Sequence, residues 1–204
     1  VDKVFETAGP SLRRFSTDTS LTEKRRRLAE FKHRFNDGDD MAALLHAVGD
    51  VVERYGSLET LFKKCLAARK EYREALAAFC GELRARAMRG AGSKPRPSFQ
   101  YLLPCPSRGS ACKRLNMYMR WMVRRNDGID LAVWHTVSPS VLVMPVDTHV
   151  ARTARRLGLT VRRTPDWRMA EDITECLRAV DGDDPVKFDF SLCRYGMTLY
   201  RKGN

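Results

Sequence analysis

The chain has 204 residues, of which 43% are hydrophobic and 30% are charged, a composition typical of globular proteins rather than disordered or fibrous ones. No apolar run approaches the roughly 20 residues of a membrane-spanning helix, and the polar, mixed first residues do not form a secretion signal. The 37 Lys and Arg residues exceed the 25 Asp and Glu residues by 12. This excess favours a polyanionic partner, although a protein that is merely soluble can show the same charge.

Helical patterns dominate the chain, and no alternating run is long enough for a sheet, so we expect an all-α fold. In chain order, helices are predicted at 21–35, at 41–56, from 57 onward, at 71–89, at about 111–124, at 148–158, at 166–182 and at 184–200. A short extended run is predicted at 140–146. The stretch GAGSKPRPS (90–98) reads as a linker. It divides the chain into an N-terminal helical part, 1–98, and a second part, 99–204, with a cleft between them.

Some of these helices carry specific local signals. In the first, Thr22 is the expected cap, and Leu28, Phe31 and Phe35 share one stripe. Ser57 and Asp166 are expected caps for later helices, since short oxygen-bearing side chains accept hydrogen bonds from the first backbone N–H groups.

The six cysteines form no C-x-x-C pair and no cluster of four that would hold zinc or an iron–sulfur centre. With no secretion signal, we expect reduced thiols in a cytoplasmic protein. Most of these cysteines are interpreted as small core residues. We expect no metal and no cofactor.

Lys113 lies in the first turn of the helix predicted at 111–124. A helix N-terminus is partly positive, and Arg114 and Arg120 lie nearby, so the lysine amine is pushed towards its neutral, nucleophilic form. From this stretch alone, a surface lysine or a phosphate contact is the simpler interpretation.

Asp147 ends the extended run and precedes the helix THVARTARRLG. Asp is a strong N-cap, and a capping Asp can still turn its second oxygen towards a cleft. The arginines that follow could bind phosphates around it or simply form a solvated helix face.

The segments that contain Lys113 and Asp147 each resemble a segment of a known enzyme superfamily. PVDTHVARTARRLGL resembles the acidic signature of the helix-hairpin-helix DNA glycosylases related to endonuclease III, and GSACKRLNMYMRW resembles the lysine-bearing helix of the archaeal 8-oxoguanine branches. The stretches FKHRFNDGDD, YGSLETLF, PSRGSACKRLNMYMRWMVR and DDPVKFDFSLCRYG are similar to a bacterial family of unknown function placed near that superfamily. This second resemblance covers most of 10–196. Members of that family have further N-terminal helices, which this chain is expected to lack.

Two departures from the glycosylase pattern are visible. The usual hairpin has two glycines, but PCPSRGSACK has only Gly109 and a longer gap to the lysine. The separation of Lys113 and Asp147 is 147 − 113 = 34 residues, longer than in the endonuclease III branch and closer to the archaeal one.

The resemblance implies a helix-hairpin-helix glycosylase-like bundle and a DNA glycosylase with AP lyase activity in base-excision repair, acting on oxidised purine such as 8-oxoguanine. Lys113 would form a Schiff base at C1′, assisted by Asp147. The partner would be double-stranded DNA, with no small-molecule cofactor and no membrane, and we expect a monomer. The alternative is a non-catalytic nucleic-acid-binding protein of the same fold.

The remaining candidate residues fall into two sets. Those for the pocket of a rotated-out base, which could equally be core, are Tyr118, Trp121, Trp134, Phe188, Asp189 and Arg194. Those for the DNA backbone are Arg108, Gly109, Arg114, Arg120, His149, Arg152, Arg155 and Arg156.

Overall fold

The structure, a computed structural model, describes residues 2–69, 71–89, 96–125 and 127–201, with side chains described up to 198. Helices make up 66% of the structure. The described residues contain 11 α-helices and one hairpin of two-residue strands. This confirms the prediction of an all-α protein. None of the described helices combines the length and apolar character needed to cross a bilayer.

The chain divides into two units, Val1–Cys105 and Pro106–Asn204, which are described separately. The boundary falls later than the predicted one at 98. The helix α7 (Pro97–Leu102) belongs to the first unit, because its Ser98 is held from both sides. The Ser98 hydroxyl donates to Asp40 Oδ1 at 3.0 Å, and the Ser98 carbonyl accepts from Asn36 Nδ2 at 2.7 Å.

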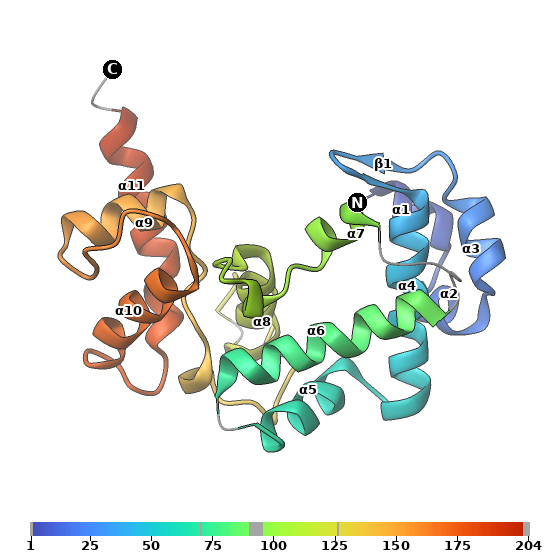
Figure 1. Cartoon of the computed structure of the whole chain (residues 1–204), viewed down its shortest axis with the longest axis horizontal. Helices are drawn as coiled ribbons and strands as arrows, with labels where there is room; N and C mark the ends of the chain where they lie inside the picture. Colours follow the sequence, from blue (N-terminus) through green and yellow to red (C-terminus); the bar gives the residue numbers. More distant parts are fainter. Residues whose placement is uncertain (1, 70, 90–95, 126, 202–204) are drawn as a thin grey trace. The chain divides into compact units, whose positions relative to one another are not determined.

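In the first unit, helices pack around α4, which contacts α2, α3, α5 and α6 (Figure 1). A Cβ at Gly49 of α4 would lie 1.9 Å from the Ser16 carbonyl oxygen, so only glycine permits α2 to pass this close. The elements before α7 are α1 (Asp2–Ala8), α2 (Leu12–Asp18), α3 (Leu21–Arg27), β1 (Lys32–His33), β2 (Asn36–Asp37), α4 (Gly38–Tyr55), α5 (Leu58–Ala67) and α6 (Tyr72–Arg89).

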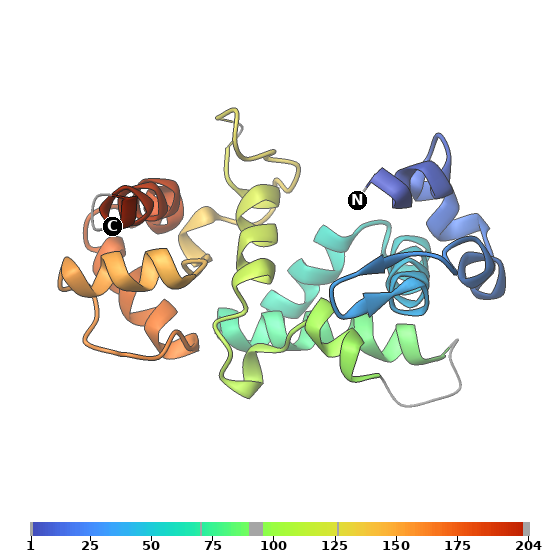
Figure 2. The same ribbon diagram turned by 90° about the horizontal axis from the view of Figure 1, so that it is seen from above.

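The helix predicted at 21–35 is shorter than expected. It ends at Arg27, and its cap is Ser20 rather than Thr22. Residues 32–37 form an antiparallel hairpin instead, drawn as two arrows in Figure 2. Arg34 has φ 57°, in the left-handed region that a helix cannot use. As a result Phe35 is 74% exposed instead of sharing a buried stripe.

Several predicted helix starts are confirmed. Ser57 caps α5 through Thr60 N at 3.0 Å, and Asp166 caps α10 through Met169 N at 2.8 Å. The helix predicted to begin at 41 begins at Gly38. Asp37 is its N-cap and forms a reciprocal capping box with Asp40, the third residue of the helix.

The second unit contains four α-helices and three 3₁₀ turns among its described residues. These are η1 (Pro106–Arg108), α8 (Lys113–Val123), η2 (Pro139–Val141), α9 (Thr148–Arg156), α10 (Trp167–Arg178), η3 (Pro185–Phe188) and α11 (Asp189–Arg201). The helices α9 and α11 pack against each other and cross in Figure 1. Gly158, with φ 74°, follows the end of α9. The run predicted as extended at 140–146 forms no described strand. Residues 140 and 141 belong to η2, and 142–146 form a buried segment that leads to α9, with Met144 N donating to Thr174 Oγ1 at 2.9 Å.

Candidate active site

Lys113 is the first residue of α8, and the turn before it is fixed by hydrogen bonds. The preceding residue, Cys112, is buried and has φ 45°, a left-handed conformation that costs a non-glycine residue about 1 kcal/mol. Its carbonyl accepts from Leu115 N at 2.9 Å and Asn116 N at 3.0 Å. The Asn116 side chain donates to the Ala111 carbonyl at 3.1 Å. The backbone that carries Lys113 is therefore held in one conformation.

Asp147 is the N-cap of α9, as predicted, and its two oxygens have different partners. Oδ1 accepts from Val150 N at 2.8 Å, and Oδ2 accepts from Lys113 Nζ at 3.0 Å. Burial alone would raise the pKa of Asp147, but the Val150 N–H and the Lys113 ammonium outweigh it, and the pKa lies below its usual value. The carboxylate is therefore charged at neutral pH.

The two members of the pair differ in exposure. The Lys113 side chain is 42% exposed and that of Asp147 is 17% exposed. A reactant can therefore approach the amine from solvent, while the carboxylate is held behind it. An amine beside a fixed carboxylate can act as a nucleophile once it gives up a proton, and the carboxylate can stabilise positive charge that develops nearby.

Cys193 of α11 is a neighbour of this pair that the sequence analysis did not single out. Its thiol lies 3.8 Å from Asp147 Oδ2. Burial and the charge of Asp147 both raise the pKa of the Cys193 thiol. The thiol is therefore protonated and is not a nucleophile at neutral pH.

Arg120 was expected to contact the DNA backbone, and the structure corrects this expectation. Its side chain is only 7% exposed. Its Nε donates to Asp130 Oδ1 at 3.0 Å, and its Nη1 donates to Asp189 Oδ2. A guanidinium buried between two carboxylates cannot also reach a phosphate, so Arg120 is an interior residue of this unit. Asp189, a candidate for the base pocket, is the partner of Arg120 in one of these two ion pairs.

Two of the aromatic candidates for the base pocket, one of them on α8, pack against each other. Tyr118 meets Trp134 edge to face, with ring centroids 5.8 Å apart. Trp134 is buried, and burial raises the pKa of Tyr118 to about 12. This contact fits the core interpretation of the two rings. Trp121, in contrast, is partly exposed.

The candidates at the end of the second unit lie near the surface. Phe188 is half-buried, and the Lys187 ammonium lies 5.1 Å from its ring centroid. Arg194 is exposed and lies over the Phe190 ring at 5.4 Å.

Most of the other residues that were predicted to contact the DNA backbone lie on the protein surface. Gly109 has φ 81°, and its carbonyl accepts from Trp167 N at 2.9 Å, which ties the turn before α8 to the start of α10. His149 is half-buried. The exposed arginines of this set are Arg108, Arg114, Arg152, Arg155 and Arg156.

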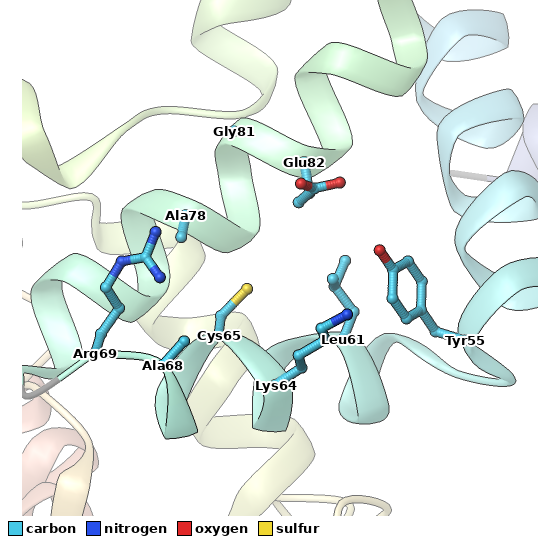
Figure 3. A pocket seen from close by; sticks show the side chains of 9 residues that line it. All are labelled: Tyr55, Leu61, Lys64, Cys65, Ala68, Arg69, Ala78, Gly81 and Glu82. Atoms are coloured by element: carbon cyan, nitrogen blue, oxygen red, sulfur yellow. The ribbon is translucent and has the colours of Figure 1, made fainter.

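The described residues contain no group of three or more His, Cys, Asp or Glu side chains placed to hold a metal ion, and all six cysteines are free thiols. A pocket of about 350 Å³ lies in the first unit between α5 and α6. Figure 3 shows Lys64 and Cys65 on one side and Glu82 on the other. None of the predicted site residues lines it.

Comparison with known proteins assigns the chain to a family. Neither the curated proteins nor the solved structures contain one that matches this chain. A family model described as "Protein of unknown function (DUF2400)" matches residues 1–198. Because that match spans nearly the whole chain, the protein belongs to the DUF2400 family.

Proposed function

We propose that the protein is a DNA glycosylase with AP lyase activity, that it acts on an oxidised purine such as 8-oxoguanine, and that its fold is a helix-hairpin-helix glycosylase-like bundle. The observation that carries this proposal is the 3.0 Å contact between Lys113 Nζ and Asp147 Oδ2. The two residues are 34 positions apart, and each stands at the start of a helix whose sequence resembles the corresponding glycosylase segment.

The chemistry needs these two groups and no metal. As the C1′–N bond of the damaged nucleoside breaks, its electron pair leaves with the base, which takes up a proton. Positive charge then develops on the deoxyribose, and the Asp147 carboxylate stabilises it. Lys113 Nζ, having given up a proton, forms a bond to C1′. The resulting secondary ammonium loses its second proton to solvent, and the freed lone pair expels O4′. Cleavage of the C1′–O4′ bond in this way gives the iminium, and O4′ takes up a proton.

The iminium makes strand cleavage possible. It acidifies C2′, so loss of a proton there expels the 3′ phosphate by β-elimination. The exposed arginines of α9 offer sites for the phosphates of double-stranded DNA. Arg108 and Arg114, close to Lys113 in the chain, would add to that contact.

A second candidate function is binding of double-stranded DNA without catalysis. The same ion pair between Lys113 and Asp147 also joins the starts of α8 and α9, and that structural role needs no reaction. The two functions differ in one respect, which is whether the amine ever becomes covalently attached to a sugar.

The experiment is borohydride trapping on duplex DNA that carries 8-oxoguanine or an abasic site. The wild type should give a covalent adduct, and Lys113→Gln should give none. Lys187→Gln is the matched control, because Lys187 is an ion-paired lysine of the same unit with a similar exposure, and it should trap like the wild type. A wild type that binds both DNAs but forms no adduct with either would favour the binding function.

A further inference from the structure

The first unit carries two exposed aromatic side chains in contact with each other, Phe35 and Tyr101, which we call the aromatic pair. Their ring centroids are 5.4 Å apart, and the ring planes are tilted by 31°. Phe35 is 74% exposed and Tyr101 is 61% exposed, more than any other aromatic side chain that the structure describes. The two rings therefore touch without being buried, and most of their surface remains open to a partner.

The two rings come from segments that are far apart in the sequence and that a buried polar network holds together. Phe35 lies in the two-residue loop of the β1–β2 hairpin, and Tyr101 lies in α7. Asn36 Nδ2, one residue further along the hairpin, donates to Asp40 Oδ2 at 3.0 Å and to the Ser98 carbonyl at 2.7 Å. The Ser98 hydroxyl donates to Asp40 Oδ1 at 3.0 Å. Asn36 and Asp40 are buried, so these bonds fix the hairpin against α7.

A second contact ties the same two segments at the surface. Arg96, the N-cap residue of α7, donates to both oxygens of Asp37 in β2, at 3.0 and 2.6 Å. A bidentate pair of this kind fixes orientation as well as distance. The aromatic pair is therefore held in place before any partner binds, which lowers the entropy that binding would cost.

Core packing does not account for the aromatic pair. The hydrophobic effect stabilises an aromatic side chain only in proportion to the apolar area that leaves water, and these two rings stay mostly in water. Adjacent exposed apolar groups on a polar surface are typical of interaction sites. The chain thus uses a buried polar network to present two rings that contribute little to the core.

The residues that lead to Phe35 supply positive charge. Lys32, His33 and Arg34 are all exposed, and no carboxylate in the described part of the chain forms an ion pair with Lys32 or Arg34. Arg34 has φ 57°, a conformation that glycine adopts with less strain. The loop therefore keeps an arginine next to Phe35 at a position where glycine would be easier to accommodate.

Exposed rings beside cations without acidic partners match a nucleic acid strand whose bases are unpaired. Every nucleobase has a flat face that stacks on an aromatic side chain, and every phosphate carries a negative charge. In a duplex the bases stack on one another, so a surface ring can stack only on bases of a single strand. An acidic peptide would offer the charge without a planar ring at each residue.

We propose that the aromatic pair binds the unpaired bases of single-stranded DNA by stacking, and that Lys32 and Arg34 contact phosphates of the same strand. The choice of DNA rests on the proposed function, but the stacking site and its cations do not. This site gives the first unit a contact with nucleic acid that requires neither Lys113 nor a damaged base.

The first test is fluorescence anisotropy of a labelled oligo(dT) of about ten nucleotides, titrated with the full chain. Phe35→Ala and Tyr101→Ala should each raise the Kd roughly tenfold. Phe35→Leu should do the same, because leucine is apolar but has no flat face, whereas Phe35→Trp should bind at least as tightly as the wild type. Phe5→Ala is the matched control, since Phe5 is 53% exposed in the same unit, and it should bind like the wild type.

The cations have a readout of their own. Replacing Lys32 and Arg34 together by glutamine should reduce the slope of log K against log salt by about 1.4, since each phosphate contact on a single strand contributes about 0.7. Lys3 and Arg26, which are exposed and ion-paired, provide the control. Changing both to glutamine removes the same charge and should leave the slope unchanged.

Crosslinking locates the bound strand. An oligonucleotide in which bromouracil replaces thymine, irradiated in complex with the wild type, should attach to the peptides that contain Phe35 or Tyr101, and mass spectrometry of the digest identifies them. Crosslinks confined to other peptides would overturn the proposal.

Other results would also contradict it. Alanine variants of the aromatic pair that bind oligo(dT) as tightly as the wild type exclude stacking on these rings. If the wild type then sediments as a dimer and those variants as monomers, the rings contact a second copy of the chain instead. Tighter binding of oligo(U) than of oligo(dT) would overturn the assignment to DNA.

The outcomes distinguish this site from the proposed function. If the alanine variants lose oligo(dT) binding but the wild type gives no borohydride adduct on damaged duplex DNA, the glycosylase function fails and the stacking site stands. An adduct in the wild type, together with unchanged oligo(dT) binding in the alanine variants, would mean the reverse.

Discussion

The two oxygens of Asp147 allow its structural and electrostatic roles to be measured separately. Asparagine keeps a side-chain oxygen that can accept from Val150 N, but it loses the charge that faces Lys113. Alanine loses both. We therefore compare Asp147→Asn and Asp147→Ala with the wild type.

The expected magnitudes follow from the contacts. An N-cap contributes about 1 kcal/mol. The ion pair contributes roughly 0.5 kcal/mol, a low value because the Lys113 side chain is 42% exposed and solvent screens it. Asp147→Asn should therefore lower the free energy of unfolding by about 0.5 kcal/mol, and Asp147→Ala by about 1.5 kcal/mol.

Urea unfolding followed by tryptophan fluorescence is the appropriate assay. All three tryptophans, Trp121, Trp134 and Trp167, lie in the second unit, so the signal reports the unit that contains Asp147. If the asparagine variant loses as much stability as the alanine variant, Oδ1 does not stabilise α9 as a cap, and the division of roles is refuted.

The pH dependence gives a second check. The pKa of Asp147 is lower in the folded state than its usual value, so its contribution is fully present above the unfolded pKa of about 4. It is lost as the pH falls through the folded pKa. The difference between the wild type and Asp147→Asn should therefore shrink on acidification, while the difference between the two variants persists. A constant wild-type difference would mean that charge plays no part.

Three further predictions concern packing, the charged interior and DNA contact. Gly196→Ala should destabilise the second unit by about 1–3 kcal/mol in the same urea assay, because its Cβ would meet the His149 carbonyl. Gly81→Ala should be neutral or stabilising by circular dichroism, because a Cβ there would meet no atom within 4 Å beyond its chain neighbours and its own helix backbone. Arg120→Met should lower the free energy of unfolding by about 3 kcal/mol, since it leaves buried carboxylates unpaired; a loss below about 1 kcal/mol would show that these charges are already neutral or hydrated. Replacement of three arginines by glutamine should weaken binding of duplex DNA of any sequence and reduce the salt slope by about 3 in fluorescence anisotropy; an unchanged slope would exclude α9 from the DNA contact. The three are Arg152, Arg155 and Arg156.

Local signals in the sequence identified three of the four predicted helix caps; the fourth, Thr22, lies two residues after the true cap, Ser20. Ser57, Asp147 and Asp166 were each predicted as caps and each accepts a hydrogen bond from a backbone N–H three residues later. Such bonds depend on a few adjacent residues, which the sequence displays directly.

Sequence patterns gave wrong predictions where the conformation or the role of a residue depends on more than helical spacing and charge. The apolar spacing that suggested a helix through Phe35 continues across a turn, and the left-handed Arg34 leaves no mark in that spacing. Arg120 looked like a phosphate contact because its partners, Asp130 and Asp189, lie 10 and 69 positions away. A basic residue that balances buried acids cannot be distinguished from a surface one by composition or by helical period.

The charged interior of the second unit also has a consequence for its response to heat. Hydration of ions becomes less favourable as the temperature rises, so the penalty for keeping these guanidinium and carboxylate groups out of water decreases, while the contribution of apolar burial levels off. Warming therefore shifts the balance of stabilising forces in this unit from its methionine and leucine contacts towards the ion pairs that Arg120 and Arg124 make. Those ion pairs then contribute a larger share of the stability of this unit, and they hold α8 through Arg120 and through Arg124, the residue that follows its last turn.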